Sequence, residues 1–103
     1  MNEHLEVVHF TIKPGEREEF LARRGPAIAA LQRRFDTLLE SRLAEFDDGT
    51  WVYVVRWGSL EQAKEAADCV ADVEEARAWL AHIDEVRDFR HAALHDSFDA
   101  DRD

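Results

Sequence analysis

The stretch "WVYVVRWGS" (residues 51–59) places three large aromatic side chains at alternating positions of a predicted strand. Side chains alternate between the two faces of a strand, so Trp51, Tyr53, Val55 and Trp57 share one face. That face must contact something that accepts large, flat groups with polar edges. An ordinary core, a subunit interface and a pocket for a flat ligand all meet this requirement.

An Asp-Gly turn precedes the aromatic strand. The run "DTLLESRLAEF" (36–46) alternates well enough to form a strand, and residues 47–50 separate it from Trp51. Asp-Gly between two alternating runs is a strong signal for a hairpin. We therefore expect these two strands to pair antiparallel.

The residues before the hairpin indicate one strand and one helix. "HLEVVHFTI" (4–12) is rich in β-branched and aromatic residues and ends near Pro14-Gly15, which predicts a first strand. "EREEFLARRGPAIAALQRRF" (16–35) has apolar residues at helical spacing and acidic residues in its first turn. It predicts a long helix, with a kink or short break at Gly25-Pro26.

Two capping boxes follow the aromatic strand. Ser59 with Gln62, and Asp72 with Glu75, predict helices over about 59–70 and 72–83. The run "EVRDFRHAALHDSF" (85–98) then predicts a last strand.

The order strand, helix, strand, strand, helix, strand is that of an α+β, ferredoxin-like βαββαβ fold with a four-stranded antiparallel sheet. Its helices cover one face of the sheet and leave the other open. Because Leu5 and Val7 make the open face apolar, we expect a second copy of the chain to cover it, as a homodimer.

Composition excludes several classes of partner. The 103 residues suit a single domain, and the net charge of -10 repels nucleic acid and anionic lipid. No apolar run is long enough to span a membrane. The single cysteine, Cys69, cannot form an internal disulfide and fits a reducing compartment. We expect a soluble, cytoplasmic protein with no nucleic-acid or membrane partner.

"VVHFTIKPGEREEF", followed by a hairpin into "WVYVVRWGSLEQA", resembles the dimeric α+β barrel superfamily, and most nearly the antibiotic biosynthesis monooxygenase-like domains. The most specific element is Trp57-Gly58-Ser59. The resemblance implies one such domain over residues 1–103, with an ordered core of about 3–98. It also implies a barrel of two facing sheets in a homodimer, with a pocket between each sheet and its own helices.

The resemblance also implies site residues. Polyketide monooxygenases of this kind carry Asn-x-x-x-Trp on the third strand, where this chain has Tyr53-x-x-x-Trp57. We expect Trp57 and Tyr53 to orient a substrate, with His82, or alternatively His9, as the general base. The residues expected to bind the substrate are Val8, Phe10, Val55 and Trp79.

The residues and the resemblance are compatible with two alternative functions. The first is a small-molecule-binding protein that could act as a cofactor-independent monooxygenase, an oxidoreductase acting on a flat phenolic or polyketide-like substrate. Such chemistry needs a dry pocket, a base and hydrogen-bond donors, and no cofactor. The alternative is a non-catalytic ligand-binding or interaction protein of the same fold, which the missing asparagine favours. The residues leave open whether the chain is an enzyme, and whether the ligand is phenolic or haem.

Three histidines raise the question of a metal. His91 and His95 share a strand face, and His9 is expected on the neighbouring strand. Residues four apart on a strand are separated by about 13 Å, too far for both to reach one ion. We therefore expect no metal site.

Overall fold

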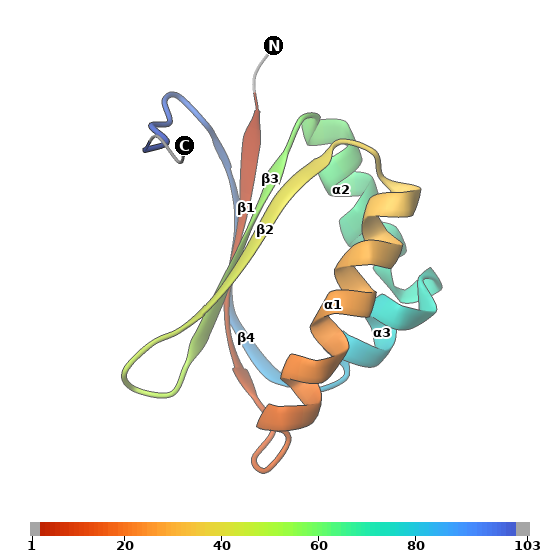
Figure 1. Cartoon of the computed structure of the whole chain (residues 1–103), viewed down its shortest axis with the longest axis vertical. Coiled ribbons are helices and arrows are strands. Elements are labelled where there is room, and N and C mark those ends of the chain that lie inside the picture. Colours follow the sequence, from red (N-terminus) through yellow and green to blue (C-terminus); the bar gives the residue numbers. More distant parts are fainter. Residues whose placement is uncertain (1–2, 101–103) are drawn as a thin grey trace.

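Four antiparallel strands form one sheet, and three helices cover one of its faces (Figure 1). The computed structural model describes residues 3–100. Its elements are β1 (His4–Ile12), α1 (Arg17–Arg34), β2 (Leu38–Glu45), β3 (Trp51–Trp57), α2 (Leu60–Cys69), the 3-10 turn η1 (Val70–Asp72), α3 (Glu74–Leu80) and β4 (Ile83–Ala93). The predicted α+β, ferredoxin-like βαββαβ order is confirmed.

The first strand lies inside the sheet, whose strand order is β2-β3-β1-β4. Glu6 on β1 is therefore flanked by Val55 on β3 and by His91 on β4, its partners in the two strand registers. Directly paired residues of neighbouring strands point to the same face. The side chains of Glu6 and His91 consequently share the face that carries the aromatic residues of β3.

The aromatic face of β3 is buried against the helices, as its alternation predicts. Burial alternates residue by residue from Trp51 to Trp57. Phe20 of α1 makes an edge contact with Trp51, with ring centroids 5.4 Å apart, and stacks on Trp79 of α3 at the same separation. Aromatic pairs at this spacing add to the stability that burial itself provides.

Of the kink or short break predicted at Gly25-Pro26, the break does not occur. Helix α1 runs from Arg17 to Arg34 with Pro26 inside it. A proline has no N–H to donate to the carbonyl of Ala22, one turn earlier. Both residues lie on the exposed side of α1, where water can satisfy that carbonyl, while Ala27 and Ala30 stay buried against the core.

One of the two predicted caps is confirmed and the other is wrong. The Ser59 hydroxyl accepts from the backbone N–H of Gln62 at 3.2 Å and begins α2. Asp72 belongs instead to the 3-10 turn η1, and Val73 is the residue that precedes α3. This additional turn delays the start of α3, which ends at Leu80, so residue 82 lies beyond the helix.

The hairpin between β2 and β3 forms as predicted. Gly49 adopts a φ of 88°, and the Asp48 carboxylate accepts from the backbone N–H of Thr50 at 2.9 Å. The last strand is displaced from its predicted range of 85–98, because β4 begins at Ile83 and ends at Ala93. Its pairing with β1 contains two register shifts, which the alternation of the sequence does not reveal.

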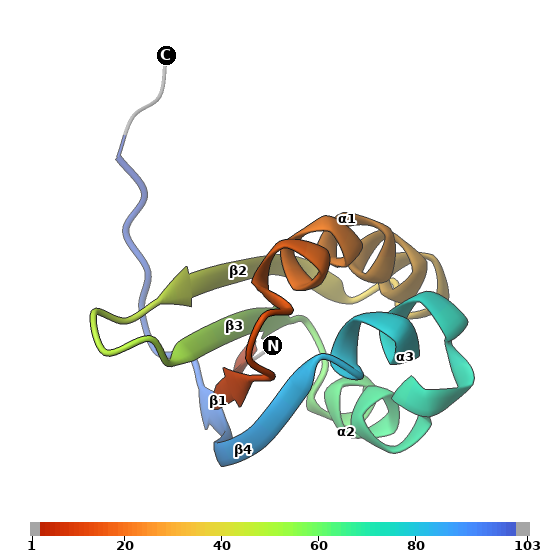
Figure 2. The same cartoon turned by 90° about the horizontal axis from the view of Figure 1, so that it is seen from below.

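The sheet face opposite the helices has an apolar centre. We call Leu5, Val7, Val52 and Val54 the open-face patch; all four are partly exposed. Charged side chains border it, including Arg56, which lies 2.8 Å from the carboxylate of Glu3. Seen from below, all three helices lie on the other side of the sheet (Figure 2).

No helix among residues 3–100 is both long enough and apolar enough to cross a membrane.

Candidate functional site

A cavity of about 360 Å³ lies between the sheet and its helices. Its apolar walls come from β1 and β3 on one side and from α1, α2, α3 and the turn η1 on the other. Examples are Val8, Val55, Leu31, Val70 and Leu80. Cavities that bind small molecules are mostly apolar and begin at about 300 Å³, so this cavity has the size and lining of a ligand site.

The polar part of the cavity is built around a buried carboxylate. Glu6 lines the cavity and is only 7% exposed. The Trp57 indole Nε1–H donates to Glu6 Oε1 at 3.1 Å. Tyr53 and Trp57 both lie diagonally across the strand pair from Glu6, because its direct partner on β3 is Val55. The alternation of β3 therefore brings both polar aromatic side chains to the same carboxylate.

Burial changes the acid–base properties of this cluster. Desolvation raises the pKa of Glu6, and hydrogen bonds from Trp57 and Tyr53 offset part of that increase. Burial and the neighbouring Glu6 raise the pKa of Tyr53. Tyr53 therefore stays a neutral phenol at neutral pH, while Glu6 can hold a proton at a higher pH than an ordinary carboxyl group.

His91 extends the cluster away from the cavity. Its Nε2 lies 4.0 Å from Glu6 Oε1, is buried, and has no hydrogen-bond partner within residues 3–100. Burial lowers the pKa of His91, and the positive charges of Lys64 and His4 add to this effect. The imidazole is therefore neutral at neutral pH, so no opposite charge is paired with Glu6 on this side.

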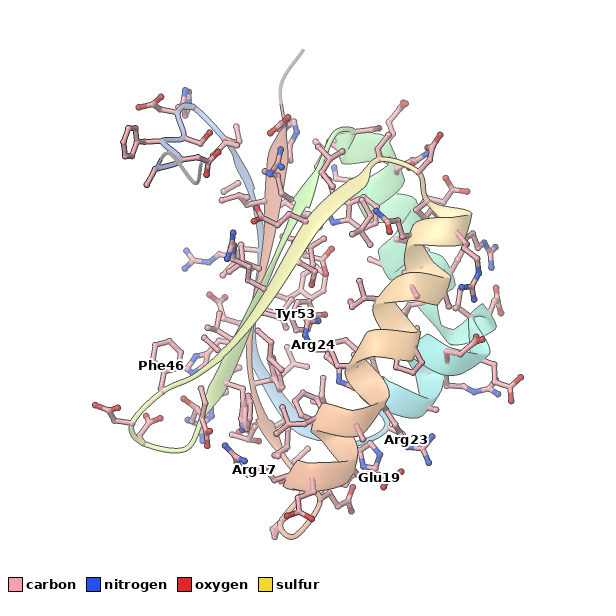
Figure 3. The ribbon with its side chains drawn as sticks, viewed as in Figure 1. Arg17, Glu19, Arg23, Arg24, Phe46 and Tyr53 are labelled. Atoms are coloured by element: carbon pink, nitrogen blue, oxygen red, sulfur yellow. The ribbon has the colours of Figure 1, made fainter. Side chains whose placement is uncertain are left out.

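Trp79 of α3 forms another part of the cavity wall. It is 2% exposed, and its indole N–H has no hydrogen-bond partner in the described part of the chain. The guanidinium of Arg24 lies 5.8 Å from the centre of the Trp79 ring and donates to the Ser41 carbonyl at 2.9 Å. Figure 3 shows Arg24 reaching from α1 into the layer between helix and sheet, where Tyr53 also lies.

The cavity reaches solvent along the edge strand β4. Val86 and Phe89 line it and are 52% and 43% exposed, although both are apolar. Asp84 also lines the cavity and is exposed. A ligand could therefore enter along β4 without displacing a helix.

Most of the residues predicted from the sequence to form the site lie around this one cavity. The five that line it are Val8, Tyr53, Val55, Trp57 and Trp79. Phe10 does not line it, because it is completely buried between the rings of Phe20 and Tyr53. Trp51 does not line the cavity either, and packs closer to the hairpin, beneath Arg17.

His82 does not line the cavity either. It follows the end of α3, and its Nδ1 lies 2.7 Å from the carboxylate of Glu16. Its backbone carbonyl accepts from the N–H of Lys13 at 2.9 Å. These contacts hold His82 between the start of α1 and the start of β4. His82 is therefore not placed to act as a base on a ligand in the cavity.

Glu6 was not among the site residues predicted from the sequence. The signal was present, because Glu6 has the same parity as the apolar residues Val8, Phe10 and Ile12 of that strand. A charged residue at such a position is rarely buried without a specific partner. The partner, Trp57, lies 51 positions along the chain, which no local pattern reveals.

The three histidines considered for a metal do not converge. His9 points to the open face of the sheet, where its Nε2 lies 3.0 Å from the Thr50 hydroxyl, whereas His91 points to the helices. His95 lies beyond the end of β4. Within residues 3–100 no three His, Cys, Asp or Glu side chains are grouped closely enough to hold one metal ion.

No protein-family model matches the chain, and no curated protein matches it in sequence. Solved structures match it over almost its whole length. A candidate antibiotic biosynthesis monooxygenase from Bordetella bronchiseptica superposes with a TM-score of 0.72 at 16% identity, covering 95% of this chain and 100% of that one. The fold is that of the antibiotic biosynthesis monooxygenases.

Two further structures extend the comparison. SnoaB from Streptomyces nogalater, described as a cofactor-independent oxygenase, matches with a TM-score of 0.65 at 18% identity, over 96% of this chain and 97% of that one. A dimeric ferredoxin-like protein from an uncultured marine organism matches with a TM-score of 0.68 at 10% identity, over 98% and 95%. The resemblance stated from the sequence is thus confirmed for the fold.

Proposed function

We propose that the chain binds a small, flat phenolic molecule in its cavity and oxidises it with O₂ without a cofactor. The observation that carries this proposal is the buried carboxylate of Glu6 in the wall of an otherwise apolar cavity of about 360 Å³. A carboxylate held there can accept the hydroxyl proton of a phenol, which is the first requirement for forming a substrate anion.

The cluster around Glu6 suits this first step. Trp57 holds the carboxylate in place, and a carboxylate has two oxygens with about four acceptor positions, so it can also accept from a ligand. Its raised pKa brings it closer to that of a phenol, which favours proton transfer. The apolar walls offer water few hydrogen-bond partners, and a bound ligand would displace it from around the anion that forms.

The complete reaction needs only O₂ as the oxidant. For an anthrone, Glu6 takes the hydroxyl proton of the enol tautomer, and the resulting anion passes electrons to O₂. The C–O bond forms at the ring carbon, and the proton returns from Glu6 to the peroxide oxygen, which gives a hydroperoxide. Loss of water from that hydroperoxide leaves a ketone. One oxygen atom of O₂ enters the product, the other leaves in water, and the ring carbon loses its two hydrogen atoms. The protein contributes the base and the dry, apolar site.

The charges of the cavity favour a neutral ligand over haem. Among residues 3–100, the two charged side chains that line it, Glu6 and Asp84, are both acidic. Haem would bring two propionate groups, which these side chains repel in the absence of a basic partner on the cavity wall. A phenol enters uncharged and becomes an anion only by giving its proton to Glu6.

Two observations favour the alternative of a non-catalytic binding protein. The N–H of Trp57 is already used by Glu6, so it is not free to stabilise charge on oxygen. Tyr53 stands where the monooxygenases that the chain resembles carry an asparagine. The cavity is the same in both functions, and they differ in whether O₂ is consumed.

We also propose that two copies of the chain form a homodimer through the open sheet face. The open-face patch is apolar at its centre and bordered by charged residues, which is the usual arrangement at subunit interfaces. The similar structure described as a dimeric ferredoxin-like protein supports it. A cytoplasmic location, expected from the single cysteine, stays a prediction.

The test combines a binding and an activity measurement on a panel of phenols and anthrones, with haem as a comparison. Tryptophan quenching measures binding, and an oxygen electrode measures turnover. Quenching with oxygen uptake that Glu6→Gln abolishes supports the monooxygenase. Quenching without uptake supports the binding protein, and the absence of both contradicts each function. The control is Glu61→Gln, at an exposed position on α2.

A further inference from the structure

A histidine lies beside Glu6 on the neighbouring edge strand. His91 on β4 is the direct strand partner of Glu6, and its Nε2 lies 4.0 Å from Glu6 Oε1. This nitrogen is buried and has no hydrogen-bond partner within residues 3–100. The His91 side chain as a whole is 19% exposed, whereas Glu6 is buried. His91 therefore lies between the buried carboxyl group and solvent.

We propose that His91 is the residue through which Glu6 exchanges its proton with solvent while a ligand fills the cavity. The inference rests on the proposed function, because it concerns the base of that reaction. Glu6 can take a proton from the ligand only when it is ionised. A ligand that enters while Glu6 is protonated closes the cavity over an inactive base, and the route through His91 lets that proton leave. His91 does not line the cavity, so it is a positioning residue that acts through Glu6.

A protonated Glu6 needs an acceptor for its O–H group, and His91 can provide one. The indole N–H of Trp57 is only a donor, so Trp57 cannot accept this proton. The Tyr53 hydroxyl can accept it, but Tyr53 is buried and lines the cavity that the ligand closes. A neutral imidazole has a lone pair on one of its nitrogens. An approach of roughly 1 Å would bring Glu6 Oε1 and His91 Nε2 within hydrogen-bond distance.

The transfer balances without a further reactant. The O–H bond of Glu6 breaks as Nε2 of His91 takes the proton, and the ring becomes an imidazolium. Its other nitrogen, Nδ1, then gives a proton to water, which leaves a neutral ring and an ionised Glu6. When the product leaves and water enters the cavity, the Nε2 proton passes by way of Glu6 to that water. Nδ1 takes another proton from solvent, which restores the starting tautomer.

The groups that face His91 keep its imidazole able to accept a proton. They are Glu6 and His4 of β1 and Lys64 of α2. Burial lowers the pKa of His91, and Lys64 and His4 add to this effect. A neutral imidazole has the lone pair that the transfer requires. Desolvation raises the pKa of Glu6, so its protonated form is populated at a pH where an exposed carboxyl group is ionised.

The first experiment measures whether the two side chains titrate together. In NMR spectra of the imidazole protons, the pKa of His91 should be lower in Glu6→Gln than in the wild type, because an ionised Glu6 stabilises the imidazolium. His95, which is exposed and lies beyond the end of β4, is the internal control and should titrate alike in both proteins. An unchanged titration of His91 overturns the inference and does not affect the proposed function.

The second experiment measures oxygen uptake with anthrone as the substrate. Positioned proton transfer contributes about 10²–10⁴-fold to a rate, so His91→Ala should lower kcat by at least about tenfold and change KM little. The loss should be greatest at the acid end of the pH profile, where Glu6 is most often protonated when the ligand enters, and should disappear at the alkaline end. His95→Ala is the control and should match the wild type.

Free imidazole distinguishes proton transfer from a structural role. It should restore kcat in His91→Ala, where it can occupy the space of the deleted ring, but not in His91→Phe, where the phenyl ring fills that space. If His91→Ala does not fold, His91→Gln replaces it in the pH profile, because an amide cannot relay a proton.

The outcomes separate the inference from the proposed function. A wild-type rate in the His91 variants, or a loss that is equal at every pH and that imidazole does not reverse, overturns the inference and leaves the proposed function standing. If the wild-type protein takes up no oxygen, the proposed oxidation is wrong, and so is the proton route that serves it.

Discussion

The indole N–H of Trp57 donates to the carboxylate of Glu6 at 3.1 Å, across the boundary between β3 and β1. The pair places a charged group in the apolar layer between sheet and helices and gives it a partner there. Both the stability of the fold and the chemistry of the cavity therefore depend on the protonation of one carboxyl group.

Glu6→Gln should make the protein more stable at neutral pH. The pKa of Glu6 is raised above 4.5 in the folded state, so the folded protein binds this proton more tightly than the unfolded chain does. The contribution of Glu6 to stability therefore falls as the pH rises from 4.5 through the raised pKa. Glutamine carries no charge at any pH and removes that loss. Each tenfold difference in proton affinity between the folded and unfolded protein corresponds to about 1.4 kcal/mol.

The measurement is the free energy of unfolding of wild type and Glu6→Gln at about pH 5 and about pH 8. The difference between the two proteins should grow with pH. Glu61→Gln serves as the exposed control, and its difference from wild type should not follow the same trend. Parallel curves for wild type and Glu6→Gln would show that Glu6 titrates normally.

Trp57→Phe should destabilise the protein mainly through Glu6. Phenylalanine keeps most of the apolar area but leaves a buried carboxylate without its donor, a loss of about 1 to 3 kcal/mol. A double-mutant cycle with Glu6→Leu, which removes both acceptor oxygens, followed by urea unfolding, isolates the pair. We expect a coupling of about 0.5 to 3 kcal/mol. Strictly additive effects would contradict the importance of this hydrogen bond.

Ser59→Ala and Asp72→Ala should differ, although both residues begin a capping-box sequence. Ser59 accepts from the backbone N–H of Gln62, so its loss should cost about 0.5 to 2 kcal/mol. Asp72 makes no cap of α3, so its replacement should change stability little. The melting temperatures of the two variants and of wild type measure this difference. An equal loss of stability in both variants would mean that α3 starts earlier than the structure shows.

Val54→Glu should separate the proposed dimer. Val54 lies in the open-face patch, where a charge would be buried without a partner on association. Leu21→Glu, at an exposed apolar position on α1, is the control and should stay dimeric. Sedimentation velocity distinguishes the species, and a wild-type protein that sediments as a monomer at micromolar concentration would remove the dimer from the proposal.

The fold could be predicted because its signals are local. The alternation from Trp51 to Trp57, the Asp48-Gly49 turn and the cap at Ser59 each follow from a few neighbouring residues, and the structure confirms all three. The predictions that were wrong concern local patterns whose outcome depends on neighbouring structure or on exposure to solvent. The pattern at Asp72 suits a cap, but a 3-10 turn occupies that position, and Pro26 is tolerated because it faces solvent.

The site was less predictable, because its contacts join distant parts of the chain. The parity of β3 places Tyr53 and Trp57 at the cavity, but nothing near either residue identifies Glu6 as their partner. His82 was expected on a helix and near a ligand. Because α3 ends at Leu80, His82 lies beyond the helix and contacts Glu16 instead. A search for charged residues with inward parity on apolar strands would have found Glu6.

The position of β1 inside the sheet has a consequence for how the chain folds. Both of its neighbours, β3 and β4, are synthesised after it. β1 therefore cannot pair with β3 until synthesis has passed Trp57, or with β4 until it has passed His91. Pairings between such distant segments form more slowly than local contacts. During that interval we expect the charge of Glu6, inside a run rich in β-branched and aromatic residues, to oppose aggregation of the unfinished chain.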